Sequence, residues 1–192
     1  MIDKSIIFKI IGSLLFIEAL LLLACLFMAI GYQEDDVPAF IITIILTTLT
    51  GIVLRYLGRN ADNNMSRRDA YLVVTLSWII FSFFGTLPFI ISGYIPSFTD
   101  AYFETMSGFT TTGATIIDDV DKLPHGLLFW RSMTQWIGGL GIVFFTTAVL
   151  PSFVGGSVKV FAAEATGPIS SRLHPRLSTG AKWIWVVYLV LT

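Results

Sequence analysis

The sequence predicts an all-α polytopic membrane protein: two leading transmembrane helices, two further spans joined by a re-entrant loop, and a truncated fifth helix. Three observations carry this prediction. The chain is 55% hydrophobic and 13% charged, and its mean hydropathy of +0.79 exceeds what soluble domains carry. Several uncharged runs reach the roughly 20 residues that cross a bilayer. Between two of these runs lies an apolar stretch rich in glycine and threonine, which does not suit a continuous helix.

The spans follow in order from the uncharged runs. We predict transmembrane helices over residues 6–30, 38–57, 71–94 and 127–150. The last uncharged run begins at Trp183 and is cut off at the end of the chain. The first stretch is too long for a signal peptide and is not followed by a small-residue cleavage site, so we interpret it as a span.

Glu18 lies near the middle of the first span. An ionised carboxylate there costs on the order of a few kcal/mol, and acids inside membranes often mark functional sites. The first span lies outside the unit that bears the loop. We therefore favour a structural role, with Glu18 protonated or paired within the bundle.

Basic residues predict the orientation, because Lys and Arg in short loops stay on the cytoplasmic side. They lie in the N-terminal segment, after the second span and after the fourth: Lys4, Lys9, Arg55, Arg59, Arg67, Arg68, Lys159, Arg172, Arg176 and Lys182. The alternate loops are acidic and contain Glu34, Asp35, Asp36, Asp118, Asp119 and Asp121, with Lys122 as the one basic residue between spans there. Both patterns agree with a cytoplasmic N-terminus.

The stretch that joins the third and fourth spans, residues 95–126, is too apolar for an ordinary outer loop. Its pattern predicts a short helix over residues 97–109, with Ser97 as N-cap and Asp100 three residues later. This helix would be roughly 18 Å long, about half a bilayer. A half-length helix followed by a Gly/Thr segment is typical of a re-entrant pore loop, whose backbone must be buried in protein or line a water-filled cavity.

The segment after the short helix has the chemistry of a cation pathway. Thr110, Thr111, Thr112 and Gly113 offer consecutive carbonyls, which can replace the hydration shell of a cation. Glycine permits the positive φ that keeps such carbonyls on one axis. The C-terminal end of the short helix carries about −0.5 e, and the acidic loops concentrate cations at the mouth. The alternative is an ordinary buried turn; we favour a selectivity filter.

Arg131 lies one turn inside the fourth span. We favour an anchor at the membrane interface over a residue that repels cations or pairs with Asp118, Asp119 or Glu104. The same span contains three glycines, Gly138, Gly139 and Gly141. We expect them to let another helix pack closely, rather than to leave room for the ion path.

Other chemistries find little support. With Cys25 as the one cysteine, and with His125 and His174 standing alone, the chain offers no disulfide and no metal constellation. The motifs of common membrane and soluble enzymes are missing from the sequence, and the net charge of −1 gives no reason to expect nucleic acid as a partner. The basic link around Arg172 and Arg176 is a candidate contact with a cytosolic partner.

Two stretches resemble a known family. Residues 103–115 read FETMSGFTTTGAT, and residues 129–142 read FWRSMTQWIGGLGI. Together they are similar to the Trk/Ktr family of bacterial potassium uptake transporters, and within it to the TrkH-like members. The resemblance covers the whole chain and corresponds to the N-terminal portion of the family.

The resemblance implies the pore-forming subunit of a K⁺ uptake system in the bacterial inner membrane, with four helix–pore loop–helix units of a potassium-channel-like fold around one pore. It implies no cofactor, with K⁺ as the transported substrate. The first-unit filter falls on Thr111, Thr112 and Gly113, with Thr110 at its inner edge, and glycine at this position implies K⁺ preference. The family also implies a homodimer that is gated by a cytosolic nucleotide-binding subunit of the TrkA type.

The chain departs from the family in length, since it contains one pore loop. We expect a fragment of a longer parent, with a two-helix membrane domain at 1–69, the first repeat at 70–155, and a cytoplasmic link with the start of the second repeat at 156–192. A structural or accessory subunit of another transporter is the alternative function. Channel-like transport and transport coupled to protons or Na⁺ would use the same filter strand, and both stay open.

Overall fold

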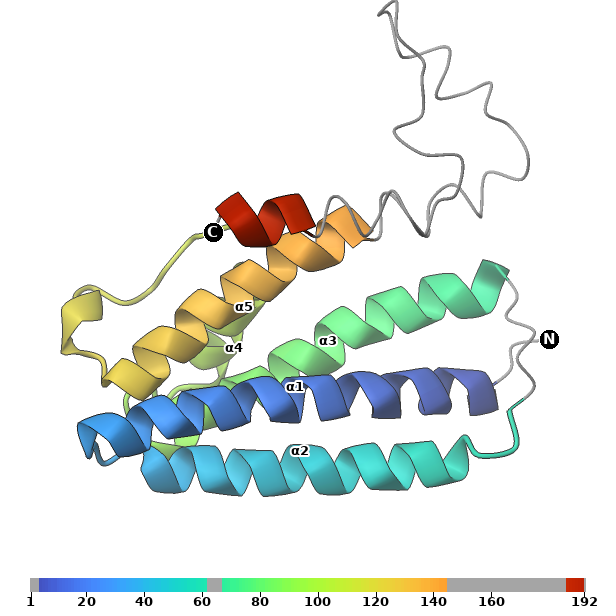
Figure 1. The fold of residues 1–192 in the computed structure, drawn as a ribbon, viewed down its shortest axis with the longest axis horizontal. Helices are drawn as coiled ribbons and strands as arrows, with labels where there is room; N and C mark the ends of the chain where they lie inside the picture. The colour runs from blue at the N-terminus through green and yellow to red at the C-terminus, as the bar shows by residue number, and fades with distance from the viewer. Residues whose placement is uncertain (1–3, 62–66, 145–185, 192) are drawn as a thin grey trace, which may run out of the picture. The chain divides into compact units, whose positions relative to one another are not determined.

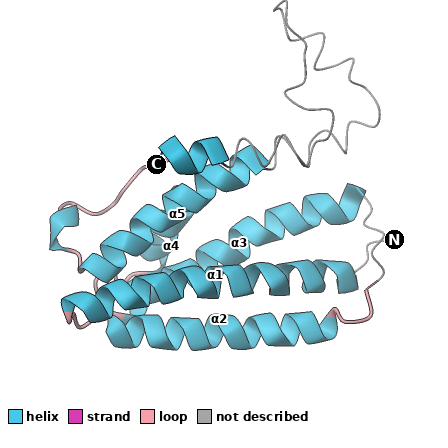
Figure 2. Cartoon of the chain, viewed as in Figure 1, coloured by secondary structure: helices cyan, strands magenta, loops and turns pink. Residues whose placement is uncertain are grey.

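The computed structural model describes residues 4–61, 67–144 and 186–191, and the regular structure of this part of the chain is helical (Figure 1, Figure 2). Its helices are α1 (Lys4–Tyr32), α2 (Val37–Leu57), α3 (Arg67–Ile91), α4 (Phe98–Phe109) and α5 (His125–Phe144), with a 3₁₀ turn η1 at Val120–Lys122 and a helical segment at 186–191. The chain forms two compact units, Met1–Trp136 and Ile137–Thr192. The architecture below is that of the first unit.

Among the described residues, three helices are long and apolar enough to cross a membrane: Lys4–Tyr32, Val37–Leu57 and Tyr71–Ile91. They confirm the first three predicted spans and the all-α polytopic class. The fourth predicted span corresponds to α5, which is described as far as Phe144. Residues 145–150 of that span, the predicted cytoplasmic link and Trp183 at the start of the fifth helix lie outside the described residues.

The observed helix ends differ from the predicted ones where turn residues intervene. The third helix ends at Ile91 rather than at residue 94, because Gly93 adopts a φ of +79° and its N–H donates a hydrogen bond to the carbonyl of Ile90. The fourth helix begins at His125 rather than at residue 127, since the Pro124 carbonyl accepts the first helical hydrogen bond, from Leu128 N, at 2.9 Å.

Glycines bring α1 and α2 close together. A Cβ atom on Gly12 would lie 2.8 Å from backbone atoms of both Arg55 and Gly51, and a Cβ on Gly58 would lie 2.5 Å from Lys9 N. Without a hydrophobic driving force between helices in lipid, such close backbone packing supplies the association energy. The two leading helices therefore form a tight antiparallel pair.

Glu18 is buried within this bundle at 1% exposure, and neither carboxylate oxygen has a hydrogen-bond partner among the described residues. Of the two predicted states, paired or protonated, the described part of the chain supplies no pair. An unpaired carboxylate is far more costly to bury when it is charged than when it is neutral, so the protonated state is favoured.

The N-terminal half of α5 packs with α3 and α4 around Gly85. A Cβ atom there would lie 2.8 Å from Thr105 Cγ2, 3.0 Å from the Phe109 ring and 3.2 Å from the Trp130 ring. The Trp130 indole N–H donates to the Gly85 carbonyl at 2.8 Å, and Trp130 and Phe109 are among the most buried side chains. This core fixes the end of α4, after which the Gly/Thr loop begins.

Candidate functional site

The short helix α4 begins and ends as the sequence predicts. Ser97 is extended at its N-cap and its hydroxyl oxygen accepts a long hydrogen bond, 3.4 Å, from Asp100 N. The helix spans 12 residues, so it is roughly 18 Å long and covers about half of a bilayer. At its C-terminal end, Thr110 N donates to the Met106 carbonyl at 2.9 Å. The half-length helix is therefore confirmed.

The chain then folds back on the last turn of α4. Thr111 and Gly113 have positive φ, +56° and +74°. Ser107 holds the loop in this shape: its carbonyl accepts from the N–H groups of Thr112, at 2.9 Å, and Gly113, at 3.4 Å, while its hydroxyl donates to the Ala114 carbonyl at 2.6 Å. One residue of α4 thus makes three hydrogen bonds to the predicted filter segment.

Three successive carbonyls of this segment are left open. Within the described residues, the carbonyl oxygens of Thr111, Thr112 and Gly113 accept no hydrogen bond, and these residues are exposed. The hydroxyls of Thr110 and Thr112 lie 2.8 Å apart. Unpaired carbonyls at the C-terminal end of a helix form a region of negative potential, which suits a cation without a bound counter-charge.

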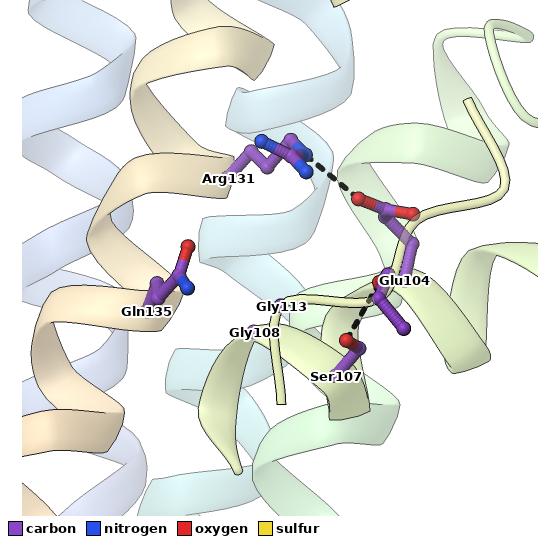
Figure 3. Close-up of a pocket in the computed structure, with 7 residues that line it drawn as sticks. Glu104, Ser107, Gly108, Gly113, Arg131 and Gln135 are labelled. Carbon is purple, nitrogen blue, oxygen red and sulfur yellow. Dashed lines mark hydrogen bonds and ion pairs between the residues drawn. The ribbon is translucent and has the colours of Figure 1, made fainter. Parts of the chain in front are cut away.

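Glu104 secures the outgoing end of the loop (Figure 3). Its buried carboxylate accepts hydrogen bonds from the Thr115 hydroxyl at 2.9 Å and from Ile116 N at 3.1 Å. It also pairs with Arg131 of α5, whose Nε lies 2.7 Å from Oε1. The interpretation of Arg131 as an interface anchor was wrong: the structure shows the alternative pairing with Glu104, because α5 runs beside α4 at this level.

A small cavity lies behind the loop. Its volume is about 10 Å³, about enough for one water molecule. Residues of α4, the loop and α5 line it: Glu104, Ser107, Gly108, Gly113, Ala114, Arg131 and Gln135 (Figure 3). Sequence reasoning missed Ser107 and Gln135 as parts of the site, and it named Glu104 only as one of three possible partners of Arg131. The signal that favours Glu104 among these partners is the isolated Glu and Arg that flank an otherwise apolar motif.

A second polar cluster joins the α1–α2 turn to the start of α5. His125 Nδ1 lies 2.6 Å from Glu34 Oε1, and its ring stacks on Tyr32 at a centroid distance of 3.9 Å. His125 therefore has an acidic partner that the sequence analysis did not predict. Among the described residues, no group of His, Cys, Asp and Glu has the arrangement of a metal site.

Asp36 is buried beside this cluster, and its Oδ2 lies against Gly126 in the first turn of α5. Burial, followed by the neighbouring charge of Glu34, raises the pKa of Asp36 above its ordinary value of 3.8. Folding therefore takes up a proton between the ordinary and the raised pKa. Stability is highest below this window, falls as the pH rises through it, and stays lowered above it.

Asp36→Asn is expected to be more stable than the unmodified protein above this window, with a difference that vanishes in acid, because the amide carries no charge to bury. The measurement is the unfolding temperature of the purified protein in detergent between about pH 3 and pH 8. Asp35→Asn, at an exposed neighbour, is the control and should show a smaller pH-dependent difference. Equal pH profiles for all three proteins would contradict the assignment.

Comparison with known proteins gives consistent similarities. Residues 36–192 match the family model TrkH, described as a cation transport protein. The chain is 36% identical over 188 residues to the Trk system potassium uptake protein TrkH of Halomonas elongata, which covers 97% of this chain and 39% of the relative. It is 37% identical to the protein of the same name from Escherichia coli K12, over 85% of this chain and 34% of that protein.

The fold has a solved counterpart. The crystal structure of the potassium transporter TrkH from Vibrio parahaemolyticus aligns with a TM-score of 0.79 and 34% sequence identity, over 98% of this chain and 37% of that chain. The chain thus spans about two-fifths of the length of the relatives it matches.

Proposed function

The chain belongs to the TrkH family of cation transport proteins, and on that basis we propose that it supplies one strand of a selectivity filter in a potassium uptake pore. The segment is the predicted one, Thr110, Thr111, Thr112 and Gly113. The observation that carries the proposal is the set of open carbonyls on Thr111, Thr112 and Gly113, held beside the C-terminal end of a half-length helix. The relatives named as potassium uptake proteins support K⁺ as the substrate.

One strand does not surround an ion, so the pore needs further strands. We expect these to come from other helix–pore loop–helix units, with the described unit lying within residues 70–155 and the leading pair within residues 1–69. Each strand would contribute oxygens from a different side, which is how rings of carbonyls replace a hydration shell. Assembly as a homodimer with a cytosolic nucleotide-binding subunit of the TrkA type is part of the same proposal.

The proposed orientation places the N-terminus in the cytoplasm of a bacterium whose inner membrane holds the protein. The start of α1 and the end of α2, with Arg55 and Arg59, lie at one end of the α1–α2 pair, opposite the acidic turn at residues 34–36 (Figure 1). Retention of basic residues on the cytoplasmic side supports this arrangement. The acidic turn then lies on the outer side, where it attracts cations.

Gly113→Ser tests the filter. A side chain at this φ of +74° is strained and would contact Gln135, so the loop and its carbonyls should shift. We expect the preference for K⁺ over Na⁺ to fall by about tenfold, which corresponds to about 1.4 kcal/mol of discrimination, in the complete subunit expressed in cells without their own K⁺ transport.

Gly93→Ser is the matched control. Gly93 also has positive φ, +79°, but no atom lies within 4 Å of its would-be Cβ. The Gly93→Ser substitution therefore imposes similar backbone strain away from the loop and should leave ion preference unchanged. An unchanged preference in Gly113→Ser, at normal membrane abundance, would instead favour an accessory structural subunit.

A further inference from the structure

We propose that Gln135 is a positioning residue for the filter, whose side chain bounds the space behind Gly113 and thereby sets ion preference. This inference rests on the proposed function. It begins from the juxtaposition of Gln135 on α5 with Gly113 of the loop across the small cavity (Figure 3).

The geometry places the Gln135 amide where a side chain of residue 113 would extend. A Cβ atom built on Gly113 would lie 3.3 Å from Gln135 Nε2, and no other atom lies within 4 Å of it outside the neighbouring residues of the chain. Gln135 lies one helical turn after Arg131 and lines the same cavity. Arg131 and Gln135 therefore lie on the same face of α5, behind the loop. Arg131 lies at the outgoing end of the loop, and Gln135 lies beside Gly113.

Within the described part of the chain, hydrogen bonds hold the middle of the loop to α4 but not to α5. Ser107 binds Thr112, Gly113 and Ala114 from α4. Nothing equivalent binds Gly113 from α5 among the described residues: no hydrogen bond joins Gln135 to Gly113, and the exposed Gln135 side chain limits the space behind this glycine. If its side chain were absent, the backbone at Gly113 would have room to rotate into the enlarged cavity. Carbonyl positions would then vary, and discrimination between ions of different size depends on those positions.

The same contact explains how a side chain at position 113 would act. A side chain there requires the Gln135 amide or the loop to move by a few tenths of an ångström, because 3.3 Å is tighter than ordinary van der Waals contact. The effects of substitutions at positions 113 and 135 should therefore be coupled.

The experiment compares Gln135→Ala, Gln135→Met, Gly113→Ser and the double variant Gly113→Ser/Gln135→Ala in the complete transporter, by K⁺ and Na⁺ uptake at matched membrane abundance. Gln135→Ala should lower the K⁺ preference about fivefold, because the side chain that limits movement of the Gly113 backbone is removed. Gln135→Met keeps the volume and should retain the preference. The further loss caused by Gly113→Ser should be smaller in the Gln135→Ala background.

Ser132→Ala is the control on the same helix, because the Ser132 hydroxyl donates to the Leu128 carbonyl and the residue does not line the cavity. An unchanged preference in Gln135→Ala, or an equal loss in Gln135→Met, overturns the inference about Gln135. If Gly113→Ser changes the preference in the same experiment, the filter itself stands. If Gly113→Ser has no effect, the proposed function fails instead.

Discussion

Glu104→Gln is expected to abolish most potassium uptake by the complete transporter and to lower its free energy of unfolding by about 3 kcal/mol, as for other ion pairs broken in the interior. The Glu104 carboxylate accepts from Arg131, Thr115 and the Ile116 N–H. An amide offers one accepting oxygen, and its NH₂ group would face at least one of these donors. The Glu104 side chain is only 2% exposed, so bulk water does not readily replace the lost hydrogen bond.

Uptake should fall because the loop loses its attachment at the outgoing end. We expect at least about a tenfold decrease in K⁺ uptake, the change that about 1.4 kcal/mol of lost ion stabilisation would cause. Uptake in cells without their own K⁺ transport and the unfolding temperature of the purified protein measure the two effects.

Asp100→Asn is the control for Glu104→Gln. Asp100 is an acid of the same helix, exposed in its first turn, and its removal should cost less than about 1 kcal/mol through the helix dipole. If Glu104→Gln transports K⁺ as well as Asp100→Asn does, the ion pair does not hold the loop.

Gly108→Ala is expected to destabilise the protein by about 1–3 kcal/mol and to impair uptake, because it overpacks the contact between α4 and α5. A Cβ on Gly108 would clash with the Thr134 hydroxyl and lie 3.0 Å from Thr134 Cβ. Thr134 is buried, and its hydroxyl donates to the Arg131 carbonyl at 2.7 Å. Thr134 has little freedom to move aside, so α4 must shift and carry the loop with it.

Two variants test the cause of that effect. Adding Thr134→Ala to Gly108→Ala removes the clashing oxygen and should restore part of both stability and uptake, a positive coupling of the kind that contacting residues show. Gly31→Ala places the same substitution in α1, where no atom lies within 4 Å, and should not destabilise. No recovery in the double variant would mean that Thr134 is not the obstacle.

The spans and the short helix were predictable because their signals are local. Length and apolarity identified α1, α2 and α3, and Ser97 with Asp100 identified the start of α4. Errors arose at ends where one residue decides the geometry, as at Gly93 with its φ of +79°. The orientation of the spans in a membrane stays a prediction.

The candidate filter segment was predictable, but the residues that support it were not. The open carbonyls follow from a Gly/Thr run after a half-length helix. The ion pairs described above join residues far apart in sequence: Glu104 and Arg131 beside the loop are 27 positions apart, and Glu34 and His125 in the second cluster are 91 apart. Periodicity within one element says nothing about such partners, because they depend on how α4 and α5 meet. The predicted roles of Thr110, Thr111, Thr112 and Gly113 still await the ion-preference measurement.

The three hydrogen bonds that Ser107 makes join the loop and the final turn of α4 into one rigid unit. A displacement of this strand has two routes: it breaks these bonds together, or it moves the end of the helix as well. A motion of the strand that keeps these bonds is therefore transmitted as a tilt or translation of α4, rather than as an independent flexing of the strand.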